Sequence, residues 1–285
     1  MTIVVIGADG QLGTDLIKQD KKIVPLIISD IDITDIEQSR YVLGKIRPEV
    51  VINTAAYNRV DDCEDEPDPA FAINAIAVSK LALVCKEIKS SLVHISTDYV
   101  FSGDSSKPYC EEDAPHPKSI YGISKLAGEY ALRYILDQYY IIRTSGLFGA
   151  AGCLGKGGSN FIEAVIKRAK SGAPVQVVND EIVSPTYTYD LAKKILEILA
   201  YKNYGIYHVV NEGCCSWHDF AKKIFDFLQI DVGLLPVSGE QFKSKARRPK
   251  YSVLEKTKLK ELGLDNLRTW DQALQAYLKE KRYIS

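Results

Sequence analysis

The sequence has almost no net charge and no long apolar run. Its 36 Lys and Arg residues are balanced by 37 Asp and Glu residues, so the formal net charge is -1. This balance argues against the extended basic surface typical of proteins that bind nucleic acid. No apolar stretch approaches the ~20 residues of a membrane-spanning helix, and no signal-like segment precedes the first expected strand. We therefore expect no nucleic-acid partner, no membrane span and no secretory signal.

The six cysteines lack the spacing of a disulfide framework or of a zinc site. Cys214 and Cys215 are adjacent, which makes a bridge between them awkward, and no Cys-x-x-Cys pair occurs. We expect free thiols in a reducing, cytoplasmic environment. The sequence also offers no convincing cluster of metal-ligating residues, so we assign no residue to a metal.

The chain does contain a regular alternation of short apolar runs and amphipathic segments. Strands buried on both faces of a parallel sheet are continuous β-branched runs, and helices show a period of 3.6 residues. By these patterns we expect strands at residues 2–6, 23–28, 50–52, 92–96 and 140–143, and helices at residues 11–19, 36–46, 69–88 and 120–136. The alternation predicts an α/β fold of the Rossmann type, a doubly wound parallel sheet.

The pattern changes after Ser145. Residues 146–158 are rich in glycine and are expected to form a loop. Further helices are predicted at residues 161–170 and 188–199, a strand at 205–210, and two helices that open with capping-box patterns, Ser216 to Asp219 and Thr269 to Gln272. We therefore predict a Rossmann domain at residues 1–148, with short returns from the C-terminal half, and a smaller mixed α/β substrate domain at residues 149–285.

A glycine pattern links the first strand to the first helix. Gly7, Gly10 and Gly13 follow the strand at spacings of three, with Asp9 among them. Glycines at such a turn let the backbone approach a pyrophosphate, which then lies at the positive end of the helix. The pattern predicts dinucleotide binding by this loop. The alternative is a tight strand-to-helix turn with no ligand.

The choice between NADH and NADPH stays open. In many such folds an acid about 20 residues further on binds the ribose hydroxyls. Asp30 and Asp32 lie just beyond the second strand, and no Arg or Lys nearby is suited to a 2′-phosphate. We expect Asp32 and Ile33 to lie near the adenine.

A Tyr and a Lys four residues apart occur four times, so the spacing alone is weak evidence. The pairs are Tyr41/Lys45, Tyr121/Lys125, Tyr189/Lys193 and Tyr277/Lys281. A surface pair at helical spacing explains the other three. The helix of Tyr121 and Lys125 follows a strand that ends in Ser96 and Thr97, at the carboxyl edge of the sheet where such folds bind ligands.

These residue types suit hydride transfer to a carbonyl. A phenol of pKa ~10 needs help to exchange protons at neutral pH, and an ammonium one helical turn away supplies it by opposite charge. We predict that Tyr121 donates the proton. Lys125 would lower the Tyr121 pKa and bind the nicotinamide ribose, and Thr97 would hydrogen-bond the substrate oxygen.

Together the motifs resemble those of the extended short-chain dehydrogenase/reductases, and within them the dTDP-4-dehydrorhamnose reductases. The resemblance covers nearly the whole chain. It rests on Gly10-Gln-Leu-Gly13, Asp32-Ile-Thr-Asp35, Asn53-Thr-Ala-Ala-Tyr57 with Val60-Asp61, Ser96-Thr-Asp-Tyr-Val-Phe101, Tyr121-Gly-Ile-Ser-Lys125 through Glu129, Arg143-Thr-Ser145, Ser184-Pro-Thr-Tyr187 and Arg248-Pro-Lys-Tyr-Ser252.

The resemblance implies reduction of the 4-keto group of dTDP-4-dehydro-L-rhamnose to dTDP-L-rhamnose, for polysaccharide synthesis. It implies that the cofactor, NADPH or NADH, contacts Gln11, Leu12, Asp32, Ile33, Ala55, Ala56 and Tyr57. It implies that Thr97, Tyr121 and Lys125 are catalytic, and that Thr97, Asp98, Tyr99, Asn160 and Arg248 face the nucleotide-sugar. The guanidinium of an Arg suits a diphosphate because it forks onto two oxygens. The resemblance also implies that Mg2+ can bind.

Two positions depart from the family pattern. Gly146 stands where the family often has a Trp near the sugar, and Ile27 stands where the family can carry an acid at the end of the second strand. The first departure bears on which sugar is bound, and the second on cofactor choice.

Several alternatives stay open at this point. Related dehydratases carry Glu after Thr-Asp, and Tyr99 at that place favours simple reduction. Reduction or epimerisation of another nucleotide 4-ketosugar remains an alternative, as does a regulatory subunit that binds a dinucleotide without turnover. The sequence also leaves monomer and homodimer open.

Overall fold

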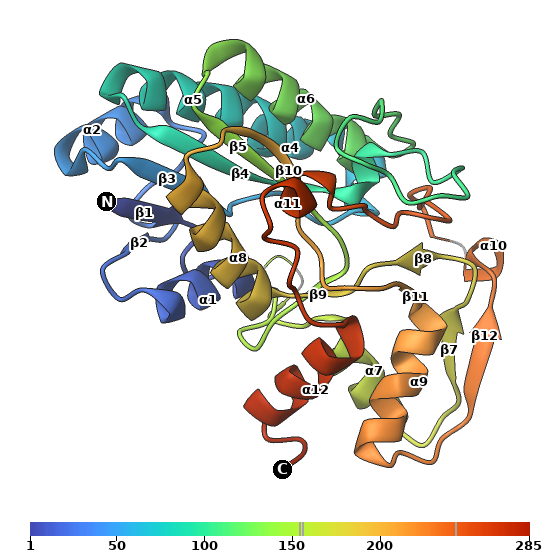
Figure 1. The fold of residues 1–285 in the computed structure, drawn as a ribbon. Helices are drawn as coiled ribbons and strands as arrows, with labels where there is room; N and C mark the ends of the chain where they lie inside the picture. Colours follow the sequence, from blue (N-terminus) through green and yellow to red (C-terminus); the bar gives the residue numbers. More distant parts are fainter. Residues whose placement is uncertain (154, 156, 243) are drawn as a thin grey trace.

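The centre of the molecule is a six-stranded parallel sheet, seen in a computed structural model that describes residues 1–153, 155, 157–242 and 244–285 (Figure 1). Leu154 and Lys156, in the predicted loop, and Lys243 lie outside the described residues. The strands are β1 (Ile3–Ile6), β2 (Val24–Leu26), β3 (Val50–Asn53), β4 (Ser91–Thr97), β5 (Tyr139–Thr144) and β10 (Gly205–His208). Their order is β10-β5-β4-β3-β1-β2, and every pairing is parallel. This confirms the predicted α/β fold.

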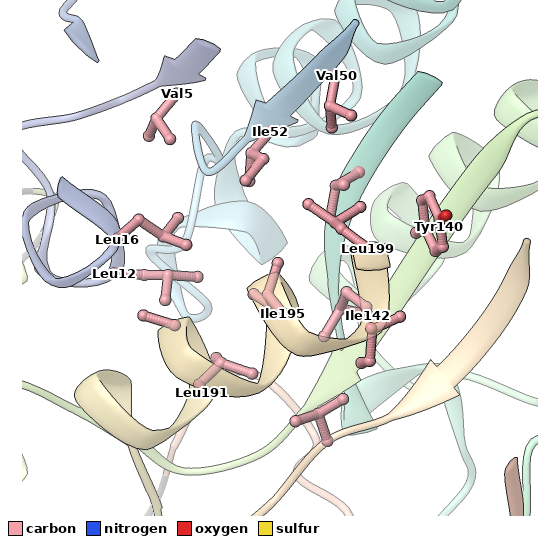
Figure 2. Packing of buried hydrophobic residues seen from close by; sticks show 14 of the residues in the cluster. Val5, Leu12, Leu16, Val50, Ile52, Tyr140, Ile142, Leu191, Ile195 and Leu199 are labelled. Atoms are coloured by element: carbon pink, nitrogen blue, oxygen red, sulfur yellow. The ribbon is translucent and has the colours of Figure 1, made fainter. Parts of the chain in front are cut away.

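Alternate residues of each strand point to opposite faces of the sheet. On one face Val5, Ile52 and Ile142 pack against α1 (Gln11–Gln19) and α8 (Thr188–Tyr201). Figure 2 shows this layer, with Leu12 and Leu16 of α1 and Leu191, Ile195 and Leu199 of α8 directed at the strands. Each such side chain, fully buried, contributes roughly 1.5–3 kcal/mol to folding.

The other face packs against three helices, α2 (Ile36–Ile46), α5 (Ala77–Ile88) and α6 (Ile120–Ile135). Val4 and Val51 point to this side. Two of the helices begin at side-chain caps, which fix where each starts. Asp35 accepts from the backbone of Glu37 and Gln38, and the hydroxyl of Ser119 accepts from Gly122.

The chain reverses its direction of travel across the sheet at β1. It runs from β1 out to β2 and then returns to β3 on the other side of β1. Such a switch point leaves a crevice outside the carboxyl ends of the strands, where ligands bind in these folds. The residues that follow β1 and β3, and those that end β4, therefore share one edge.

A smaller cluster of elements lies beyond that edge, in the lower part of Figure 1. It buries Phe148, Ile162, Phe220 and Tyr277. Its elements are α7 (Phe161–Ala169), β7 (Val175–Val178), α9 (Trp217–Leu228), β12 (Leu234–Val237) and α12 (Trp270–Glu280). Short pairs are β6 (Leu147–Phe148) with β9 (Thr186–Tyr187), and β8 (Ile182–Val183) with β11 (Cys215–Ser216). Other short helices are α3 (Asp62–Asp65), α10 (Gly239–Phe242) and α11 (Thr257–Glu261).

Two element predictions were wrong in their extent. The strand expected at residues 23–28 covers only Val24–Leu26, because β2 is an edge strand containing Pro25, and Ile28 is exposed. The helix expected at residues 69–88 begins at Pro67 as α4 (Pro67–Phe71) and continues through a π-helical segment, Ala72–Ile76, into α5. Such π segments are frequent at functional sites.

All six cysteines are free thiols, as expected. Among the described residues, the helices are too short or too polar for any of them to cross a membrane.

Candidate active site

The loop after β1 is closely packed against the start of α1. Gly7 has a φ of 76°, a backbone conformation that residues other than glycine rarely adopt. A Cβ on Gly13 would lie 2.2 Å from the carbonyl oxygen of Gly7, so only glycine lets α1 approach the loop. Thr54, which follows β3, closes the other side by donating its hydroxyl to the carbonyl of Ile6 at 2.8 Å.

The N-terminus of α1 is open to an anion. Its N-cap, Gly10, has no side chain to satisfy the first backbone N–H groups, and its first turn holds no acidic residue. Within the described part of the chain, the buried Oε1 of Gln11 has no hydrogen-bond partner. A helix N-terminus of this kind suits a pyrophosphate. The residues therefore fit a dinucleotide.

The residues expected near the adenine lie beyond β2. The carboxylate of Asp32 accepts from the backbone N and hydroxyl of Thr34, at 2.9 and 2.7 Å, and Ile33 is buried. The carboxylate of Asp30 accepts from the backbone N of Ile27 at 2.9 Å. Both acids therefore shape the turn between β2 and α2.

Asn74 joins the loop after β3 to the helix that carries Tyr121. Its Oδ1 accepts from the backbone N of Tyr57, and its Nδ2 donates to the carbonyl of Tyr57, each at 2.9 Å. Nδ2 also lies 3.0 Å from the hydroxyl of Ser124, which donates to the carbonyl of Tyr121. Asn74 lies in the π segment. This link holds the loop of Ala55, Ala56 and Tyr57 at a fixed place relative to Tyr121.

Tyr121 and Thr97 lie together at the carboxyl end of β4. Tyr121 is the second residue of α6, and its ring meets the ring of Tyr99 edge-on, with centroids 5.6 Å apart. Burial raises the pKa of the Tyr121 hydroxyl, and a hydrogen bond with Thr97 opposes that rise. The expected lowering of this pKa is therefore not seen in this arrangement, because burial outweighs the favourable contacts. The hydroxyl stays protonated at neutral pH.

Lys125 points at the sheet. It is buried, and its Nζ donates to the carbonyl of Ile95 at 2.6 Å and lies 3.4 Å from Nε2 of His94. Burial lowers the pKa of Lys125 to about 8, and the carboxylate of Glu129 opposes that change. At neutral pH the side chain is mostly charged.

Asp98 is an anchor between distant segments. Its buried carboxylate accepts hydrogen bonds from Thr97 at 3.0 Å, Ser145 at 2.8 Å and Ser252 at 2.5 Å. Burial raises its pKa, and the three hydroxyls oppose the rise. With these bonds made, the carboxylate ties Ser145 and Ser252 to the end of β4.

Arg248 lies near Tyr99, where the resemblance places the nucleotide-sugar. Its Nη2 donates to the carboxylate of Asp61 at 3.0 Å, and its charge lowers the pKa of Tyr99 against the larger effect of burial. Burial raises the pKa of the neighbouring Glu181 to about 7, with Arg248 opposing. The guanidinium is thus paired with the loop after β3, and its charge acts on Glu181, the residue before β8.

Asn160 serves as a helix cap. Its Oδ1 accepts from the backbone N of Glu163, and its Nδ2 donates to the carbonyl of Gly149 and to the hydroxyl of Tyr277. All these groups are internal, so its expected contact with the sugar stays a prediction.

The described residues do not fit a magnesium site. Within the described ranges, no group of three or more His, Cys, Asp and Glu side chains is placed to hold a metal ion. Asp15 and Glu280 do approach one another, but the ammonium of Lys18 bridges them at 2.9 and 2.7 Å. The ammonium of Lys18 therefore occupies the place between these two carboxylates.

Comparison with known proteins places the chain in a family. The family model described as the RmlD substrate binding domain matches residues 1–283. The chain belongs to this family. It is 41% identical to the spore coat polysaccharide biosynthesis protein SpsK of Bacillus subtilis over 98% of this chain and 97% of that protein.

Two further matches bear on chemistry. A probable dTDP-4,6-dihydroxy-2-methyloxan-3-one 4-ketoreductase of Streptomyces antibioticus is 36% identical over 96% of this chain and 93% of that protein. The solved structure of a dTDP-4-dehydrorhamnose reductase from Bacillus anthracis, in complex with NADP, has a TM-score of 0.93 and 40% identity, covering 98% of this chain and 100% of that one. As a member of this family of ketosugar reductases, the chain is an oxidoreductase.

The structure adds residues that the sequence did not single out for the site. Asn74 and His94 stand in apolar runs, where a single polar residue gives little sign of a role in the site. Glu181 precedes a short strand that was not predicted. Asp61, Ser145 and Ser252 belong to the motifs that carry the family resemblance, and the structure shows which partners they contact.

Proposed function

We propose that this protein reduces the 4-keto group of dTDP-4-dehydro-L-rhamnose to give dTDP-L-rhamnose, with NADPH or NADH as cofactor. The observation that carries the proposal is the placement of Tyr121 beside Thr97, at the carboxyl end of β4, in a chain of this family. That edge also holds the glycine loop. A proton donor, a second hydroxyl and a dinucleotide site are the parts that this reaction needs.

The chain's residues fit the cofactor at the N-terminus of α1. Backbone N–H groups near Gly10, Gln11 and Leu12 would bind the pyrophosphate, and Asp32 and Ile33 would lie near the adenine. When bound, the nicotinamide supplies the hydride that the keto carbon accepts. The NADP named for the Bacillus anthracis structure supports NADPH. NADH remains an alternative because Asp30, in the exposed turn after β2, is an acid that could bind the ribose hydroxyls.

Tyr121 acts as the general acid in this proposal. A phenol of ordinary pKa ~10 is protonated at neutral pH, and burial raises the pKa of Tyr121 further, so its hydroxyl is in the right state to donate. As the keto carbon gains the hydride, negative charge develops on its oxygen, and Tyr121 gives that oxygen its proton. The Thr97 hydroxyl donates a hydrogen bond to the same oxygen. Positioned acid catalysis of this kind accelerates reactions by roughly 10²–10⁴-fold.

Lys125 would hold the nicotinamide ribose and stabilise the Tyr121 phenolate after proton transfer. The side chain is long and flexible, and its Nζ now contacts the carbonyl of Ile95. For this role the ammonium must leave that carbonyl and approach Tyr121. Its charge would then favour the phenolate until the proton is replaced.

Arg248 would bind the diphosphate of the sugar nucleotide. The guanidinium is half-buried, and its Nη2 donates to the carboxylate of Asp61. A guanidinium has five N–H donors in a planar fork, so it can bind a diphosphate in addition to this acid. Ser252 lies four residues after Arg248 and donates its hydroxyl to Asp98. This bond positions the segment of Arg248 at the end of β4.

A second substrate has an observation in its favour. Gly146 has a φ of 55°, and a Cβ there would lie 3.1 Å from Cα of Pro185, so the backbone is shaped for glycine. Without a large side chain at this position, another dTDP-linked 4-ketosugar would have more room. The Streptomyces antibioticus relative, named as a 4-ketoreductase of a different sugar, supports this alternative.

The experiment supplies purified protein with dTDP-4-dehydro-L-rhamnose generated in situ, and follows NADPH and NADH oxidation in parallel. The proposal expects one cofactor to be consumed with an equal amount of dTDP-L-rhamnose formed. If no cofactor is consumed although it binds, the same assay is run with dTDP-4-keto-6-deoxy-D-glucose. Turnover of only the second sugar would replace the proposed substrate, and turnover of neither would contradict the reductase proposal.

A further inference from the structure

The lysine assigned to catalysis is packed against a buried histidine. His94 lies in β4, three residues before Thr97, and its side chain is 0% exposed. Its Nε2 lies 3.4 Å from Nζ of Lys125, which also donates to the carbonyl of the next residue, Ile95. The ammonium therefore rests in a place made by two consecutive residues of the strand.

The charges around Lys125 determine which form of the histidine can stand there. Glu129 lies one turn further along α6 and is paired with Arg143 of β5, whose Nη2 lies 2.7 Å from its carboxylate. Burial, together with the Lys125 charge, holds the pKa of His94 well below its usual range. The ring is neutral, so its Nε2 can accept a hydrogen bond from the ammonium.

This arrangement leaves one polar atom unused. When Nε2 accepts, the ring proton is on Nδ1, and Nδ1 has no hydrogen-bond partner among the described residues. A buried N–H without a partner is destabilising, and an apolar side chain would avoid that cost. The hydrogen bond that Nε2 accepts from Lys125 offsets this cost, which accounts for a histidine at this place.

We propose that His94 is a positioning residue for Lys125, holding its ammonium charged against β4 through a neutral Nε2. The proposal rests on the function proposed above for Lys125. It explains how a lysine that must be charged to act can remain charged at a buried site one helical turn from Tyr121. Without the acceptor, burial would act on the ammonium with less opposition and the Lys125 pKa would fall.

The tautomer of His94 gives a test that needs neither substrate nor cofactor. The chain has only four histidines, so ¹⁵N-edited NMR of the imidazoles is tractable. We expect the His94 ring to remain neutral from pH 5 to pH 9 with its proton on Nδ1. The His94 signals are those missing from the spectrum of His94→Gln. A proton on Nε2, or a ring that titrates near pH 6.5, would overturn the proposal.

The variants His94→Phe and His94→Gln test the effect on Lys125. Phe removes the acceptor, whereas Gln places an amide oxygen near the position of Nε2. The readout is the affinity for NADPH, measured by fluorescence between pH 6 and pH 10. We expect His94→Phe to move the alkaline loss of affinity down by about one pH unit, because one hydrogen bond to a charged group is worth about that much. His94→Gln should restore most of the difference.

The matched control is His208→Phe. His208 is also 0% exposed, and it lies on β10 of the same sheet, where its Nδ1 contacts the carbonyl of Glu255. This variant should lower thermal stability and leave the pH profile unchanged. If His94→Phe does the same, His94 has only a structural role. NADPH binding is independent of the sugar, so failure of the reductase assay and failure of this proposal are separate results.

Discussion

The carboxylate of Asp98 accepts a hydrogen bond from the hydroxyl of Ser252, a residue 154 positions further along the chain, at 2.5 Å. Asp98 directly follows Thr97, the last residue of β4, and Ser252 lies four residues after Arg248. The bond therefore joins the place assigned to proton transfer with the place assigned to the diphosphate. A segment from the C-terminal part of the chain is held at the edge of the sheet by one buried acid.

Replacing Ser252 by Ala should raise the KM for the dTDP-sugar by about tenfold, with kcat changed less than about twofold. The reason is that a hydrogen bond to a charged group, worth ~1.5–3 kcal/mol, no longer holds the segment of Arg248. Steady-state kinetics give both constants, and the NADPH Kd should not change. The control is Ser171→Ala, an exposed serine whose hydroxyl donates to the nearby carbonyl of Arg168. Unchanged KM in Ser252→Ala would show that this bond does not position Arg248.

Replacing Gly13 by Ala should weaken dinucleotide binding by at least about tenfold. The new Cβ would stand 2.2 Å from the carbonyl of Gly7, so the loop and the start of α1 must separate. Gly44→Ala is the matched control. It is also a helical glycine, and a Cβ there meets no described atom within 4 Å. The variant should therefore bind NADPH normally and gain ~0.5–1 kcal/mol in stability. Equal NADPH affinity in both variants would argue against this loop as the cofactor site.

Glu181 should make folding stability depend on pH. Burial raises its pKa from 4.5 to about 7, with Arg248 opposing and Asp180 and Asp61 adding to the rise. The folded protein then binds this proton more tightly than the unfolded chain. The contribution of Glu181 therefore declines as the pH rises from about 4.5 to about 7, and is level above that.

The measurement for Glu181 is the free energy of unfolding of the wild type and of Glu181→Gln by urea, at pH 5 and pH 8. Relative to the wild type, the variant should be more stable at pH 8 than at pH 5. The difference between the two proteins isolates this group from the others that titrate. The same difference at both pH values would mean that Glu181 is ionised normally in the folded protein.

The fold could be predicted from local pattern because parallel strands buried on both faces leave a strong signal. Residues 11–19 and 36–46 were predicted as helices with the bounds that α1 and α2 have. The short pair β6 and β9 was not foreseen, because two residues carry no periodicity and the pairing is between segments nearly 40 residues apart. The π segment around Asn74 differs from an α-helix only in its hydrogen bonds, which no residue pattern specifies.

The site could be predicted in its chemistry but not in its contacts. Thr97 and Tyr121 come together because one ends a strand and the other begins the following helix. The direction of Lys125 depends on the carbonyl of Ile95 and on the ring of His94, which are across a packed interface. Spacing along a helix gives the face of a side chain and not the partner it contacts there.

The most direct test of the account is the kinetics of Tyr121→Phe beside those of Tyr41→Phe. Tyr41 also precedes a lysine by four residues, but it is 63% exposed on α2. We predict that Tyr121→Phe lowers kcat with the 4-ketosugar by about 10²–10⁴-fold and leaves the NADPH Kd nearly unchanged, because one proton donor is lost and the fold is kept. Tyr41→Phe should turn over as the wild type does. Turnover by Tyr121→Phe at the wild-type rate would contradict the assignment of Tyr121 as the acid.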